Sequence, residues 1–188
     1  MTAQRIDRAG ARQLMIDALK SREASTITVE SPAFADGSEI PKTNCDYGGG
    51  RSPELRWSTV PSGTRSVAVV AEDPDVSQKT PFTHWLLYNL SPETRHLPES
   101  LPNDSRLTSF DGAMQGRTSV GTIGYYGPHP PANDREHHYH FELFCLDAPL
   151  DVGPGATRDQ VMNAMAGHVL AKGELTGTLR GAKRTLTR

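Results

Sequence analysis

Residues 66–72, SVAVVAE, are the segment that most constrains how this chain can fold. The run is apolar at almost every position and rich in valine, so it predicts a strand that is buried on both faces of a sheet. Segments 83–90 (THWLLYNL), 138–146 (HYHFELFCL) and 174–180 (ELTGTLR) also have strand character. Turn-forming residues fill the stretches between them, so the pattern predicts a mainly β single domain.

The body of the chain contains one segment that predicts a good helix, at 158–172. Thr157 precedes it as a candidate N-cap, and Gly173 follows it as a stop signal. Its apolar face would consist of Val161, Met162, Met165 and Val169.

Residues 3–22 predict a second, isolated helix with a narrow apolar stripe. This helix can dock on the body of the protein, pack in a dimer, cover the mouth of a pocket, or fray. We therefore divide the chain into an N-terminal helical extension at 1–24 and one domain at 25–188, and a homodimer is one expectation for the assembly.

The charge balance argues against nucleic acid and anionic membranes as partners. The 188 residues include 20 Lys and Arg and 22 Asp and Glu, with no basic block. The first 22 residues lack the apolar core of a secretory signal, and no apolar run reaches the roughly 18 residues of a membrane span. We therefore expect a cytoplasmic protein. Cys45 and Cys145 are expected as reduced thiols, although one bridge between them can form.

Two carboxylates and a histidine lie near strand ends. Asp73-Pro74-Asp75 follows the buried strand, and the proline turns the chain away from the sheet. His84 opens the next strand on a face that continues with apolar residues, so it needs a buried partner, for which Asp73 is the candidate. A purely structural role remains open for each, because Asp is common in turns and a buried His can serve the fold alone.

A stiff loop follows at 127–131, with the sequence GPHPP. Consecutive prolines restrict the backbone, and Gly127 permits close approach of another segment. Such a loop can form the wall of a pocket or a simple turn.

The stretch EHHYHF at 136–141 contains three histidines. Strand alternation divides them between two faces, since neighbouring side chains point in opposite directions. His137 and Tyr139 share the face that becomes apolar, so we expect them to point inward. His138 and His140 share the other face, which we expect to be exposed to solvent or to a subunit.

Two catalytic site types find little support. His138 and His140 could hold Zn or Fe together, but no Cys cluster or HExxH motif supplies further ligands, so we predict no metal and no cofactor. A serine hydrolase is not indicated, because the chain has no G-x-S-x-G motif.

Taken together, these motifs resemble the phosphatidylethanolamine-binding protein family, in particular its bacterial branch related to Raf kinase inhibitor protein. The resemblance covers roughly residues 27–180 and rests on D-P-D, H-W, G-P-x-P-P and H-x-Y in this order. It also has departures: His138 stands where the family usually has Arg, Val76-Ser77 replace Ala-Pro, Gly50-Arg51 replace an Asp or Asn before S-P, and the loop 132–136 lacks the usual Gly.

The resemblance implies two antiparallel sheets with Greek-key connections, a C-terminal helix and a small anion-binding pocket at one end. The candidate ligand-binding residues are Asp73, Asp75, His84, Gly127, His129, Pro130, Pro131, His137 and Tyr139.

Three functions follow as expectations. The first is a binding protein for a small phosphate- or carboxylate-bearing molecule or a phospholipid headgroup, which could regulate a partner. The second is an acid–base enzyme, a hydrolase, isomerase or cyclase, that uses Asp73, His84, His137 and Tyr139. The third is an inhibitor of a protein kinase or protease, as some members of the family are.

Overall fold

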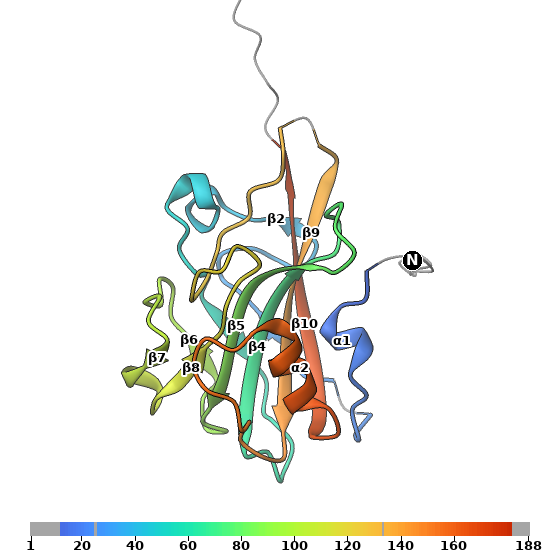
Figure 1. Ribbon diagram of the computed structural model, residues 1–188, viewed down its shortest axis with the longest axis vertical. Helices are drawn as coiled ribbons and strands as arrows, with labels where there is room; N and C mark the ends of the chain where they lie inside the picture. Colours follow the sequence, from blue (N-terminus) through green and yellow to red (C-terminus); the bar gives the residue numbers. More distant parts are fainter. Residues whose placement is uncertain (1–11, 25, 133, 182–188) are drawn as a thin grey trace, which may run out of the picture.

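The structure is a computed structural model that describes residues 12–24, 26–132 and 134–181. It is mainly β, as predicted. A large sheet runs through the molecule in the strand order β2-β10-β9-β4-β5-β8-β7 (Figure 1). Its strands are β2 (Ser38–Glu39), β4 (Ser66–Asp73), β5 (Phe82–Leu90), β7 (Arg106–Leu107), β8 (Ala113–Gln115), β9 (Glu136–Leu146) and β10 (Val169–Arg180). All pairs are antiparallel except β2 with β10, which is parallel.

A second, small sheet has the order β1-β3-β6 and is antiparallel. Its strands are β1 (Val29–Glu30), β3 (Leu55–Trp57) and β6 (His96–Leu97). Three short 3-10 helices lie in the connections, η1 (Lys42–Asn44), η2 (Asp46–Gly48) and η3 (Thr108–Phe110).

Two apolar clusters cover the two faces of the large sheet. The first cluster joins the large sheet to the small one and contains Tyr139, Phe141, Leu143 and Cys145. The second lies under the helices α1 (Met15–Ala18) and α2 (Arg158–Met165), the latter drawn across the strands in Figure 1. Coverage of both faces explains why every residue of β4 is buried, as its continuous apolar sequence predicts.

The helix predicted at 158–172 is shorter than expected. Thr157 caps α2 as predicted, in a capping box with Gln160. The helix ends at Met165 because Gly167 adopts a left-handed conformation with φ of +81°. Val169, expected on the helix face, instead begins β10 and pairs with β9.

The N-terminal prediction is also corrected. Of the helix expected at 3–22, residues 1–11 lie outside the described residues, and only Met15–Ala18 is helical in the remainder. Leu14, Met15, Ile16 and Leu19 are buried in the second cluster of the same chain. Of the alternatives weighed above, docking on the body is therefore what residues 14–19 do.

Polar contacts fasten this segment at both ends. Glu72 accepts the backbone N–H of Met15, and Glu142 accepts that of Ile16. At the other end, the Lys172 ammonium donates to the carbonyls of Ile16 and Leu19. The helix has a single turn, so these contacts satisfy backbone groups that its own hydrogen bonds leave open.

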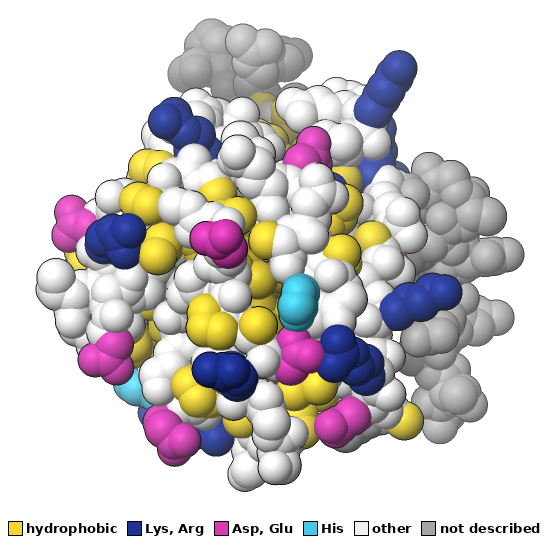
Figure 2. Space-filling view, turned by 60° about the horizontal axis from the view of Figure 1, so that its bottom comes forward, with side chains coloured by type: hydrophobic (Ala, Val, Ile, Leu, Met, Phe, Trp, Pro, Cys, Tyr) yellow, Lys and Arg dark blue, Asp and Glu magenta, His cyan; other side chains and the backbone are white. Residues whose placement is uncertain are grey.

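Figure 2 views the molecule from the end at the bottom of Figure 1, where Lys and Arg side chains are interspersed with Asp and Glu. Among the described residues, no helix has the length and apolar character needed to cross a bilayer. Cys45 and Cys145 are both buried, free thiols.

Candidate functional site

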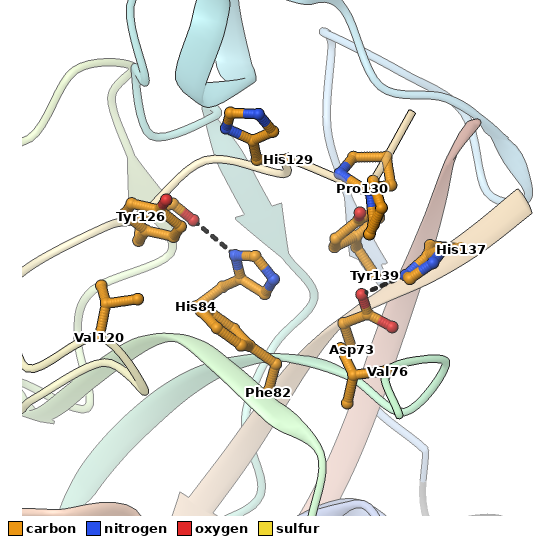
Figure 3. Close-up of a pocket in the computed structure, with 11 residues that line it drawn as sticks. Asp73, Val76, Phe82, His84, Val120, Tyr126, His129, Pro130, His137 and Tyr139 are labelled. Carbon is orange, nitrogen blue, oxygen red and sulfur yellow. Dashed lines mark hydrogen bonds and ion pairs between the residues drawn. The ribbon is translucent and has the colours of Figure 1, made fainter. Parts of the chain in front are cut away.

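A cavity of about 140 Å³ lies at one end of the large sheet, where β4 ends and β5 and β9 begin (Figure 3). Antiparallel pairing brings these three points together, because the C-terminal end of one strand lies beside the N-terminal end of the next. Seven of the nine predicted residues line the cavity: Asp73, His84, His129, Pro130, Pro131, His137 and Tyr139.

Asp73 pairs with His137, not with His84 as expected. The His137 Nδ1 lies 2.7 Å from an Asp73 oxygen, and each of the two side chains is 3% exposed. β4 has β5 on one side and β9 on the other, so Asp73 had two candidate histidines, and the structure pairs it with the one on β9.

The protonation of this pair follows from its surroundings. Burial lowers the pKa of His137, but the hydrogen bonds to Asp73 and Asp134 outweigh it and raise that pKa above its ordinary value. Burial also raises the pKa of Asp73, an effect that the hydrogen bond to His137 partly offsets. The arrangement favours a charged imidazolium beside an ionised Asp73 near neutral pH.

His84 has the opposite character. Its Nδ1 lies 2.7 Å from the Tyr126 carbonyl, which can only accept a hydrogen bond, so Nδ1 carries the hydrogen. Burial lowers the pKa of His84 to about 4, with a smaller opposing effect from the bond to Tyr126. His84 is therefore neutral near pH 7, and its Nε2 carries a lone pair. Figure 3 shows this second nitrogen on the side of the ring that faces away from Tyr126, toward Asp73 and His137.

Tyr139 stands between the two imidazoles. Its ring meets His84 edge-on, with centroids 5.2 Å apart, and is nearly parallel to the His137 ring at 6.4 Å. Burial, with a contribution from the charge of Asp73, raises the pKa of Tyr139 far above its ordinary value. The phenol therefore keeps its proton and can donate a hydrogen bond.

Two predicted residues do not line the cavity. Asp75 accepts hydrogen bonds from the backbone N–H and Nδ1 of His138, at 2.9 and 2.8 Å, and so fastens the turn to β9. Gly127 packs against backbone, because a Cβ there would lie 2.4 Å from the Asp46 nitrogen. It lets the proline-rich loop approach η2, where His129 contacts the Asp46 carboxylate at 2.8 Å.

Four lining residues were not predicted: Val76, Phe82, Val120 and Tyr126. Phe82 lies two positions before His84, on the same face of β5, and strand alternation could have identified it. Tyr126 directly precedes the GPHPP loop. Val76 follows the D-P-D turn, whereas Val120 is 52% exposed and has no sequence signal that marks it.

The expectation for the second face of β9 holds for His138, whose side chain is 45% exposed, but it is wrong for His140. His137 and Tyr139 lie on the face of the sheet that packs against the first apolar cluster, as predicted, and each is 2% exposed. His140, however, is only 5% exposed and contacts Glu174 at 3.1 Å, and Glu142 is fully buried. This face is covered by α1 and α2, which provide polar partners such as the Ile16 N–H.

Comparison with known proteins identifies the family. Residues 30–180 match the sequence profile of the phosphatidylethanolamine-binding protein family. A UPF0098 protein of Methanothermobacter thermautotrophicus is 41% identical over 155 residues, which cover 82% of this chain and 99% of that protein. A UPF0098 protein of Aquifex aeolicus is 38% identical over 160 residues, covering 85% and 91% of the two chains.

Two solved structures share the fold. A putative phosphatidylethanolamine-binding protein homologue from Chlamydia trachomatis superposes with a TM-score of 0.73 at 37% identity, covering 84% of this chain and 99% of that one. YbcL of E. coli, described as a member of the mammalian family, gives a TM-score of 0.75 at 28% identity, with 83% and 99% coverage. With its two sheets and its match over residues 30–180, this chain belongs to the phosphatidylethanolamine-binding protein family.

Proposed function

We propose that the protein binds a small anionic group, a phosphate or carboxylate of a free metabolite or a phospholipid headgroup, in the cavity at the end of the large sheet. The observation that carries this proposal is the placement of His84 and His137 on either side of the Tyr139 ring. The cavity, at about 140 Å³, is below the roughly 300 Å³ at which drug-sized ligand sites begin. It therefore suits a small group and not a whole lipid.

The protonation states define how an anion would bind. The Tyr139 hydroxyl can donate, because its raised pKa keeps it protonated. The His84 Nε2 cannot donate while the ring is neutral. An anion therefore binds well only if the ring gains a proton on binding, or if the ligand brings its own O–H, as a phosphate monoanion does.

This requirement predicts a pH dependence. His84 has a depressed pKa of about 4 in the free protein, and an anion beside it favours the charged ring. His137 loses its charge as the pH rises through its raised pKa. Phosphate affinity should therefore fall as the pH rises, by at most about tenfold per pH unit for one linked proton.

Calorimetry with inorganic phosphate checks this expectation. Titrations in two buffers of different ionisation enthalpy should report proton uptake on binding near pH 7, and the variant H84Q should lose the part due to His84. Equal phosphate affinities at pH 5.5 and pH 8 would contradict the proposal. Vesicles with and without phosphatidylethanolamine then distinguish a lipid headgroup from a free phosphate as the source.

An acid–base enzyme is the second candidate, because the cavity holds one neutral and one charged imidazole. Environments that push two pKa values apart are typical of general acid–base pairs. A screen of phosphate esters and lactones should then find a substrate whose turnover falls about 100-fold or more in H84Q. Unchanged turnover in H84Q would rule His84 out as the base.

Inhibition of a protein kinase or protease stays a prediction. Co-purification of such an enzyme, with lower activity in the presence of this protein, would support it.

A further inference from the structure

His137 has no free ring nitrogen for a ligand. Its Nδ1 lies 2.7 Å from the Asp73 carboxylate, and its Nε2 lies 3.1 Å from the Asp134 carboxylate. A charged imidazolium has two N–H donors, one on each nitrogen, and here both point at carboxylates. An anion in the cavity can accept a hydrogen bond from His137 only if one of the two carboxylates moves away.

The two carboxylates differ in how firmly they are held. The Asp73 side chain is 3% exposed, and its second oxygen accepts the backbone N–H of Asp75 at 2.7 Å. The Asp134 side chain is 41% exposed, and its other oxygen accepts the N–H of the next residue, Arg135, at 2.8 Å. Water can solvate Asp134 once it leaves His137, whereas Asp73 would remain a buried charge. Asp134 is therefore the carboxylate that a ligand can replace.

We propose that the Asp134 carboxylate occupies the position on the His137 Nε2 that the ligand's anionic group takes, so that it acts as a built-in competitor for the pocket. This inference rests on the proposed anion-binding function and adds a residue that controls affinity. Asp134 does not line the cavity itself, and neither sequence motifs nor the family resemblance singled it out.

The charges around His137 explain the expected effect of removing the competitor. In the free protein the imidazolium stands between two carboxylates, so this group of three side chains has a net negative charge. Replacing Asp134 by Asn leaves one carboxylate and one imidazolium, which repel an incoming anion less. Asp73 remains to keep His137 charged, so the donor itself is retained.

The test compares phosphate binding by the wild type, D134N and the matched control E136Q. Glu136 is exposed and lies two residues further along the chain, so E136Q removes a negative charge close by without touching the His137 ring contacts. Near pH 6, where Asp73 still favours the charged His137 ring, D134N should bind phosphate about two- to fivefold more tightly, the effect of releasing a partly exposed ion pair. E136Q should stay near the wild type.

NMR titration of the histidine side chains supplies an independent readout. The pKa of His137 should fall in D134N, because one of its two carboxylate partners is gone, and should stay the same in E136Q. Equal or weaker phosphate binding by D134N, or an unchanged His137 titration, would overturn the competitor role while leaving anion binding in place. Failure of all three proteins to bind phosphate would overturn the proposed function and the competition with it.

Discussion

Replacing Arg158 by Met should destabilise the fold by about 3–5 kcal/mol, the usual effect of removing one partner from a buried ion pair. The guanidinium, 15% exposed, contacts the fully buried Glu72 carboxylate at 2.5 and 3.2 Å. It also donates to the carbonyl of Gln13, so it ties the first turn of α2 to the N-terminal segment. Without it, Glu72 is a buried charge, and the Met15 N–H is the one hydrogen-bond donor that the described part of the chain still offers it.

The neighbouring Glu142 should increase the loss of stability in R158M. Its side chain is fully buried, and one of its oxygens has no hydrogen-bond partner among the residues that the structure describes. Burial, with repulsion from Glu72, raises the pKa of Glu142 well above its ordinary value, so the site already resists a second negative charge. Loss of the Arg158 charge should raise that pKa further.

Urea denaturation near pH 7 measures the effect. The double variant E72Q/R158M should recover much of the lost stability, because Gln can still accept the Met15 N–H and carries no charge. The control R56M removes an exposed ion pair with Glu54, which should contribute little to stability because solvent screens it. Similar losses in R158M and R56M would show that the buried network does not stabilise the fold.

This buried network also marks the limit of prediction from sequence. Alternation placed His137 and Tyr139 on the inward face correctly, because the residues that follow them on that face are all apolar. The same rule failed for His140 and Glu142, since polar residues can be covered when distant segments supply their partners. Those partners are Glu174 for His140 and the Ile16 N–H for Glu142, which lie far away in sequence, and no local pattern reports them.

Strand pairing explains the other predictions that the structure corrects. The turn after β4 predicted that Asp73 lies near a histidine, but only the sheet order shows that β9 as well as β5 is its neighbour. The apolar pattern at 158–172 fits a helix face throughout, yet its last residues pair with β9 in place of continuing the helix. Local patterns predicted the elements and most of the cavity lining, and long-range pairing decided which residues meet.

The second large effect concerns Asp73, whose replacement by Asn should weaken phosphate binding by about tenfold or more, the range for a hydrogen bond to a charged group. A simple count of charges predicts the reverse, because D73N removes a carboxylate from the lining of a proposed anion site. The geometry decides between these two effects. Asp73 and His137 form a neutral pair at 2.7 Å, and the buried ring loses its main source of charge when the carboxylate is lost.

After D73N, burial still lowers the pKa of His137, and only the more exposed Asp134 remains to raise it. The ring should therefore be largely neutral near pH 7, so the pair's net charge stays at zero while a charged donor disappears. D134N has the opposite result, because Asp73 keeps His137 charged when Asp134 is removed.

The same two measurements, calorimetry with phosphate and NMR titration of His137, distinguish the two carboxylates. Both variants should lower the pKa of His137, D73N by more than D134N, since Asp73 is the closer and the more deeply buried partner. Only D73N should weaken phosphate binding near pH 7. If D73N bound phosphate as tightly as the wild type, the charge on His137 would not contribute to anion binding. Tyr139 and His84 would then have to provide the hydrogen bonds that hold the anion.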